Sequence, residues 1–199
     1  MTASTMALLD QDELMRLALA ASGENDTGAA IGYLKEAISR PDARAIAHFL
    51  LGAEYATIKM YDRAIEEMQK ALEMDASLAI VRLQLGLLWL SSGVAETAAT
   101  VLAPLQELPA DDPLRLFGAG LTHLMRDEFT EASSNLQAGI ARNDSNPALN
   151  TDMQKIVQEI DNLRAQGKIP ASEEKAKVDE TESDSQHILL SAYTSTTTH

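Results

Sequence analysis

The sequence predicts an all-α fold, a right-handed α-solenoid of about four helix-turn-helix repeats with a C-terminal cap helix. Two observations carry this prediction. A set of small and apolar positions recurs about every 34 residues, in register and without an insertion. The apolar content of 45% comes mostly from Ala and Leu, with only 4% aromatic residues. This composition favours close helix packing over a β-sandwich, whose strands prefer β-branched and aromatic residues.

The repeated pattern is clearest in residues 45–78. Leu51-Gly52 is followed by Tyr55, and Ala64 is followed four positions later by Met68. Leu-Gly-x-x-Tyr and Ala-x-x-x-(large apolar) at this spacing are typical of one helix-turn-helix unit of about 34 residues. On these residues the chain resembles the tetratricopeptide repeat family. The resemblance implies stacked repeats whose first helices line a concave, peptide-binding surface.

The other repeats keep the same register. Their matching positions are Leu17, Ala30, Leu34 and Ala37 in the first repeat, Leu85, Gly86, Trp89, Ala98 and Leu102 in the third, and Gly120, Phe129, Ala132 and Leu136 in the fourth. We divide the chain into an N-terminal arm (1–10), four repeats (11–44, 45–78, 79–112 and 113–146), a cap helix (147–167), an acidic linker (168–186) and a C-terminal segment (187–199).

Small residues in both helices of a repeat predict close helix packing. Gly on the first helix and Ala on the second let the two helices approach, and larger apolar side chains fill the space beside them. The positions concerned are Gly52, Gly86 and Gly120 on the first helices, and Ala64, Ala98 and Ala132 on the second. We interpret these residues as packing positions.

Three repeats depart from the pattern. The first has Ala18 and Gly28 where a glycine and an aromatic residue would stand, as expected of a terminal repeat. In the third, Pro104 should kink or shorten the second helix. In the fourth, Gly118 and Gly139 lie inside helices beside Gly120, and each glycine should cost about 1 kcal/mol against Ala.

A cap helix follows the repeats. Asn146 is a good N-cap, Pro147 a good first helical residue, and the helix should end at Gly167. Its apolar stripe consists of Leu149, Met153, Ile156, Val157, Ile160 and Leu163. The opposite face is polar, as expected of a helix that closes an open stack of repeats.

The C-terminal part changes character after Pro170. Residues 171–185 are acidic and poor in apolar side chains, which predicts a disordered linker. A short apolar motif follows, made of Ile188, Leu189, Leu190 and Tyr193. It is either a frayed terminus or a docking motif. A flexible linker of about 20 residues spans roughly 25 Å, enough to bring the motif back over the protein's own groove.

The family resemblance also assigns the groove. Its lining positions here are nearly all apolar: Met15, Leu19, Ile46, Phe49, Ile80, Leu83, Leu87, Leu90, Leu114, Phe117, Leu121, Leu124 and Met125. The stretch 80–90 is apolar on almost every side, and such a helix must be covered on every side. An apolar peptide, internal packing or a second copy of the chain could supply the cover.

Composition argues against several function classes. A formal net charge of -14 makes binding to nucleic acid or to an anionic membrane surface unfavourable. We expect no membrane insertion, because no stretch approaches the roughly 20 apolar residues of a membrane span. The sequence has no cysteine and no apolar signal-peptide core near its start, so we expect a cytoplasmic protein.

We also expect neither catalysis nor a cofactor. The sequence carries no HExxH motif, glycine-rich phosphate loop or nucleophile elbow. His48 and His123 fall at different positions two repeats apart, which argues against a shared metal site.

Two subfamilies bear on function. Tetratricopeptide co-chaperones of heat-shock proteins bind a C-terminal carboxylate through charged lining residues, whereas Met15 and Leu19 are apolar here. Residues 111–136 are similar in style to tetratricopeptide chaperones of bacterial type III secretion, which hold hydrophobic substrates.

We therefore predict a non-enzymatic protein-interaction module, an adaptor or assembly factor, that binds an apolar peptide or amphipathic helix. The alternatives are a bacterial chaperone for a hydrophobic secreted or membrane-associated client, and a homo-oligomer in which a second copy buries the groove. The partner would be a protein with an apolar segment, the chain's own tail or a second copy. The sequence identifies neither the partner nor the stoichiometry.

Overall fold

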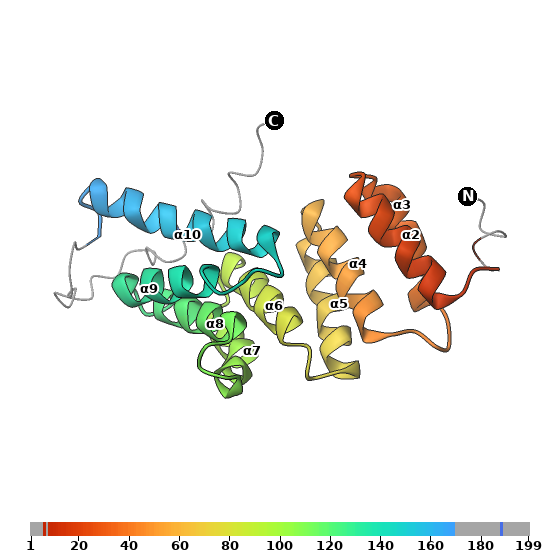
Figure 1. The fold of residues 1–199 in the computed structure, drawn as a ribbon, viewed down its shortest axis with the longest axis horizontal. Helices are drawn as coiled ribbons and strands as arrows, with labels where there is room; N and C mark the ends of the chain where they lie inside the picture. Colours follow the sequence, from red (N-terminus) through yellow and green to blue (C-terminus); the bar gives the residue numbers. More distant parts are fainter. Residues whose placement is uncertain (1–5, 7, 170–187, 189–199) are drawn as a thin grey trace. The chain divides into compact units, whose positions relative to one another are not determined.

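The computed structural model describes residue 6, residues 8–169 and residue 188 (Figure 1). These residues form helices and turns, with no strand among them. The predicted all-α class is therefore confirmed. The chain separates into two compact units, Met1–Val81 and Arg82–His199, which we describe one at a time.

The first unit contains two helical hairpins. They are α2 (Gln11–Gly23) with α3 (Thr27–Ile38), and α4 (Ala45–Thr57) with α5 (Tyr61–Met74) (Figure 1). Asp10 opens α2 with a reciprocal cap, because its carboxylate accepts from the Glu13 N–H while the Glu13 carboxylate accepts from the Asp10 N–H, both at 2.8 Å. Within the unit, α3 also packs against α4.

The second unit begins inside α6 (Ala79–Ser91) and continues through α7 (Ala95–Leu102) and the 3-10 helix η1 (Ala103–Glu107). The hairpin of α8 (Pro113–Leu124) and α9 (Phe129–Ile140) follows, and then α10 (Pro147–Ala165) (Figure 1). The chain leaves the α-helix at Leu102 and tightens into η1, whose first turn contains Pro104. The predicted shortening of this helix at Pro104 is confirmed.

The turn inside each helical hairpin has the same backbone conformation at the same position of all four repeats. Asn25, Lys59, Gly93 and Asp127 all have positive φ, between 56° and 77°. The residue after each of them donates its N–H to a carbonyl five positions earlier, at 2.8 to 3.0 Å. These four residues stand at one position of the four predicted repeats. Only one of them is a glycine, so sequence inspection for turn glycines misses the pattern.

The small residues permit close helix contact, as predicted. A Cβ atom added at Gly52 would lie 3.0 Å from the Ala64 carbonyl oxygen, and one at Gly120 would lie 3.2 Å from that of Ala132. A Cβ atom at Gly86 would lie 2.5 Å from the Leu102 side chain. The contact at Gly86 is shorter than real Cβ contacts, and the two backbone contacts are tighter than most of them, so a larger residue would push these neighbours apart.

The glycines of the fourth repeat also have a packing role that their helix propensity hides. A Cβ atom at Gly139 would lie 2.5 Å from the Phe117 ring, and one at Gly118 would lie 2.9 Å from Leu105. Phe117 and Leu105 are fully buried. The cost of glycine in the helix is therefore offset by the apolar packing that it allows.

Polar contacts join α4 to α5. His48 Nδ1 lies 2.7 Å from Glu67 Oε2, and the ammonium group of Lys70 donates to Glu66 at 3.0 Å and to Glu67 at 3.1 Å. The hydrogen bond to Glu66, followed by that to Glu67, raises the pKa of Lys70. The cluster therefore gives the half-buried face of this hairpin a charge-assisted link between its helices.

The last helix matches its predicted pattern. Asn146 accepts the Leu149 N–H at 3.0 Å, Pro147 stands in the first turn, and Gly167 has a φ of 68° just past the end. All six apolar residues of the predicted stripe are buried, and α10 packs on α9. The buried Asn143 side chain donates to Asn150 Oδ1 at 2.8 Å and to the Asn146 carbonyl at 3.0 Å. This network fixes the bend before α10.

Replacement of Gly139 tests the packing role of the helical glycines. Gly139→Ala should lower the free energy of unfolding by about 1–2 kcal/mol, because the clash with Phe117 outweighs the gain in helix propensity. Gly32→Ala is the matched control, since nothing lies within 4 Å of a Cβ atom at Gly32 in α3. It should raise stability by up to about 1 kcal/mol. Urea unfolding measures both, and a stabilised Gly139→Ala variant would contradict the packing role.

Candidate peptide-binding pocket

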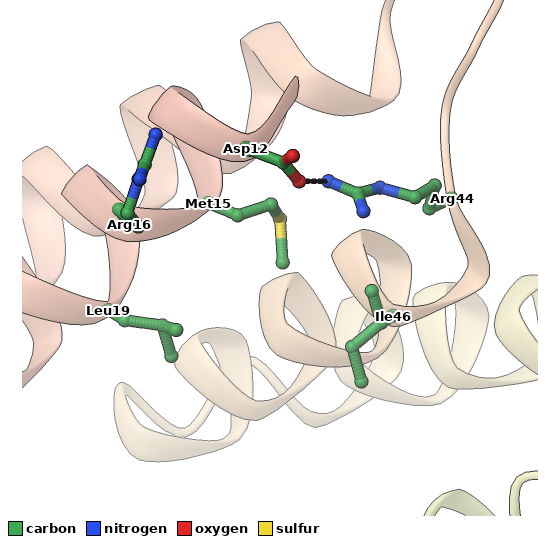
Figure 2. Close-up of a pocket in the computed structure, with 6 residues that line it drawn as sticks. All are labelled: Asp12, Met15, Arg16, Leu19, Arg44 and Ile46. Carbon is green, nitrogen blue, oxygen red and sulfur yellow. Dashed lines mark hydrogen bonds and ion pairs between the residues drawn. The ribbon is translucent and has the colours of Figure 1, made fainter. Parts of the chain in front are cut away.

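A surface pocket of about 310 Å³ lies between α2 and the start of α4, inside the first unit (Figure 2). Its size is at the lower end of the range for ligand pockets. Four of its residues come from α2 and two from the start of α4 and the residue before it. They are Asp12, Met15, Arg16 and Leu19, with Arg44 and Ile46.

The floor of the pocket is apolar. Met15 is buried and points between the two helices, while Leu19 and Ile46 flank it on opposite sides (Figure 2). Leu19 is 54% exposed and Ile46 36% exposed, so both present apolar surface to solvent. These three residues are predicted groove positions, and the structure brings them together in one concave site.

The rim of the pocket is charged. An ion pair with 2.6 Å between Arg44 Nη2 and Asp12 Oδ1 joins the start of α4 to the first turn of α2. Arg16 stands one turn further along α2, and its guanidinium group points away from that pair (Figure 2). Since Arg44 and Asp12 are both well exposed, the pair contributes at most about 1 kcal/mol to stability.

Helical periodicity explains why these side chains share one face. Residues three or four apart on a helix are neighbours, so Asp12, Met15, Arg16 and Leu19 form a continuous strip of α2. Our sequence analysis selected only the apolar members of this strip. The i, i+4 spacing of Asp12 and Arg16 around Met15 is the signal that could have identified the charged ones.

The other predicted groove residues are partly or fully buried. Ile80, Leu114 and Met125 are half-buried. Ten per cent exposure or less is found for Phe49, Leu83, Leu87, Leu90, Phe117, Leu121 and Leu124. Most of these side chains therefore contact other parts of the chain. Their role as binding residues stays a prediction.

The glycines explain this burial. In the second unit Leu102 packs over Gly86, Leu105 over Gly118 and Leu136 over Gly120. Repeat position alone could not predict how closely these neighbours would cover α6 and α8. Leu102 thus covers part of the apolar stretch of α6 from within the second unit.

The predicted docking motif is only partly described. Ile188 is fully buried, with an exposed fraction of 0%. Leu189, Leu190 and Tyr193 lie outside the described residues, as does most of the predicted acidic linker.

Three further observations concern metal ions, histidine contacts and membranes. Among the described residues, no three His, Cys, Asp or Glu side chains gather as a metal site would require. His48 lies 2.7 Å from the carboxylate of Glu67 on the partner helix α5. His123 lies 2.6 Å from the carboxylate of Glu128 in the turn between α8 and α9. Within the part of the chain that the structure describes, no helix has the length and apolar character needed to cross a membrane.

Comparison with known proteins identifies the repeat. Residues 45–78, which form α4, α5 and the turn after them, match the family model described as tetratricopeptide repeat. Residues 45–78 are therefore one tetratricopeptide repeat, and the solved structures below share the fold of the chain around it. The comparison with curated proteins finds no match.

Solved structures of MamA share the fold. The structure described as the crystal structure of MamA superposes with a TM-score of 0.56 at 20% identity, over 67% of this chain and 78% of that one. A MamA fragment from Desulfovibrio magneticus RS-1, residue 41 to the end, gives a TM-score of 0.57 at 14% identity, over 79% and 86%. A double mutant of MamA RS-1 gives 0.57 at 13%, over 94% and 96%. At this identity the likeness supports the repeat fold and says nothing of a shared ligand.

Glutamate substitutions distinguish core positions from pocket positions. Leu87→Glu should cost more than about 3 kcal/mol of stability, because Leu87 is 2% exposed and an unpaired carboxylate would be buried. Leu19→Glu should leave stability within about 0.5 kcal/mol, because Leu19 is largely in contact with solvent. Thermal unfolding followed by circular dichroism measures both. Equal losses for the two variants would contradict this assignment of core and surface.

Proposed function

We propose that this tetratricopeptide protein is a non-enzymatic interaction module that takes an apolar segment of a partner protein into the α2–α4 pocket. The observation that carries the proposal is the convergence of Leu19 and Ile46 over Met15 in a concave site. When a partner covers apolar side chains that are exposed in a pocket, the free energy of the complex is lowered.

The size of this gain limits the mode of binding. Full burial of a Leu or Ile side chain contributes about 1.5–3 kcal/mol, and Leu19 and Ile46 have about half and a third of their surface left to bury. Together they offer roughly 1–3 kcal/mol, or one to two factors of ten in affinity. The pocket alone therefore anchors a partner without accounting for the whole affinity. A segment that also contacts the rim or the neighbouring helix surface fits better than an isolated side chain.

Peptide selection tests this proposal. Short random peptides displayed and selected on the full chain should yield binders rich in Leu, Ile, Met or Phe. Their affinity should fall at least about tenfold on Leu19→Glu and on Ile46→Glu, because each change places a charge in the apolar floor. Ile58→Glu is the matched control, since Ile58 is 43% exposed at the end of α4 and does not line the pocket. Fluorescence anisotropy measures the affinities.

The result can also contradict the proposal. Selected peptides whose binding survives both pocket substitutions, or falls equally with Ile58→Glu, would place the binding surface elsewhere.

A second role is supported by Ile188. We propose that the C-terminal motif docks within its own chain, because Ile188 is completely buried although the sequence before it is acidic and polar. Ile188→Glu should therefore raise the fluorescence of an apolar dye in the full chain, whereas Thr197→Glu, nine positions further on, should not. Equal and low dye fluorescence in wild type and Ile188→Glu would contradict docking of the motif.

The remaining sequence-derived alternatives stay predictions. They are the chaperone for a hydrophobic secreted or membrane-associated client, the homo-oligomer with a buried groove, and the cytoplasmic location. The burial of Leu83, Leu87, Phe117 and Leu121 within one chain supports neither a client nor a second copy as the cover for the second unit.

A further inference from the structure

We propose that Met6, Leu8 and Leu9 of the N-terminal arm form a strap that Arg40 closes onto the first helical hairpin, and that closure of this strap sets the spacing of α2 and α4 at the pocket. As regulation of the pocket, this proposal rests on the proposed function. Three sets of long-range polar contacts in the first unit, and the order in which its helices pack, support it.

Arg40, just past the end of α3, holds the strap by its main chain. Its guanidinium group donates from Nη1 to the carbonyl oxygen of Leu9 and from Nη2 to that of Met6, the latter at 2.8 Å. Glu36 accepts from the same group at 3.1 and 3.2 Å and fixes its orientation. The Leu9 N–H also donates to the Met6 carbonyl at 3.1 Å, which makes the strap a closed turn. Hydrogen bonds from a charged guanidinium group are stronger than neutral ones, and the Arg40 side chain is only 18% exposed.

The side chains of the strap contribute less to its closure than Arg40 does. Leu8 is 85% exposed, and Met6 and Leu9 are half-buried. Closure therefore gains little from apolar burial of Leu8. An open and a closed strap then differ mainly by the contacts of one arginine, which is the arrangement expected of an element with two states.

Two further contacts extend the link from the strap to the pocket. The Gln11 amide group donates to the Ala37 carbonyl at 2.8 Å and to Asp42 Oδ1 at 3.2 Å, and Gln11 is buried. One residue later, Asp12 forms the ion pair of the pocket rim with Arg44 at 2.6 Å. A continuous series of contacts thus joins the strap and the first turn of α2 to the end of α3 and the segment before α4.

The two walls of the pocket depend on this series because they do not pack closely on each other. Within the first unit, α2 packs against α3 and α3 against α4, whereas α2 and α4 form no comparable packed pair. The position of α2 relative to α4 is therefore set through α3 and through the polar contacts at the start of α2. Release of the strap removes the first of these contacts, so the start of α2 gains freedom and the pocket is less preorganised for a ligand.

Spin labels test strap closure on the full chain without a ligand, since the sequence contains no cysteine. One pair of labels, on Leu8→Cys and Ser39→Cys, reports the strap. A second pair, on Ala20→Cys and Thr57→Cys, reports the far ends of α2 and α4, and all of these residues are exposed. Both pairs should give narrow distance distributions by pulsed electron paramagnetic resonance. Arg40→Gln should broaden both, because a glutamine side chain cannot reach the two carbonyls and carries no charge.

Two other arginine variants are the controls. Arg40→Lys keeps the charge beside Glu36 but has a single ammonium group, so its broadening should be intermediate. It also carries the test if Arg40→Gln does not fold. Arg126→Gln removes the same charge from an exposed arginine in the second unit and should leave both distributions narrow. Equal broadening in Arg126→Gln would contradict a specific role of Arg40.

The outcomes separate the strap from the proposed function. Unchanged distributions in the Arg40 variants, or broadening of the strap pair alone, would overturn control of the pocket by the strap. Where both pairs broaden, the affinity of a selected peptide should fall by about three- to tenfold, because the pocket is competent to bind for only part of the time. If Leu19→Glu weakens binding and Arg40→Gln does not, the pocket stands and its regulation is wrong. If Leu19→Glu leaves peptide affinity unchanged, the proposed function is wrong whatever the labels show.

Discussion

The close contact between the two helices of each hairpin is the constraint on which the remaining structure depends. At Gly52 and Gly120 the first helix meets a backbone carbonyl of the second so closely that a methyl group would push the two helices apart. Such contact fixes the separation and the register of the pair, and hence which side chains point outward. The left-handed turn residues at Asn25, Lys59, Gly93 and Asp127 complete this constraint, because they reverse the chain in the same way each time.

The same constraint explains why the apolar helices of the second unit are well covered. In the second unit three glycines admit large leucines from neighbouring segments, and the apolar faces of α6 and α8 are covered from within the chain. In the first repeat the equivalent small position is Ala18, and the following Leu19 stays exposed. Ala18 is itself buried, so the exposure of Leu19 reflects its place on the outer side of α2.

The sequence predicted those features that depend on local pattern. The helical class, the shortening at Pro104, the caps of α10 and its buried stripe all follow from periodicity or from the chemistry of one residue. The burial of Leu87 and Phe117 could not be predicted from the sequence pattern, because it depends on how closely other segments pack against α6 and α8. The positive φ of Lys59 was also hidden, since a lysine carries no turn signal and adopts this conformation only because the hairpin imposes it.

The charges of the pocket rim were missed for a different reason, and this reason bears on specificity. Repeat position assigns a face of the helix but gives no preference between Met15 and its neighbour Arg16. In a chain with a net charge of -14, acidic partners are repelled at long range and basic partners are attracted without selectivity. Screening limits that field to about 8 Å at physiological ionic strength, whereas a contact inside a pocket is screened much less. Contacts made inside the pocket therefore depend much less on the net charge of the chain than the first approach of a partner does.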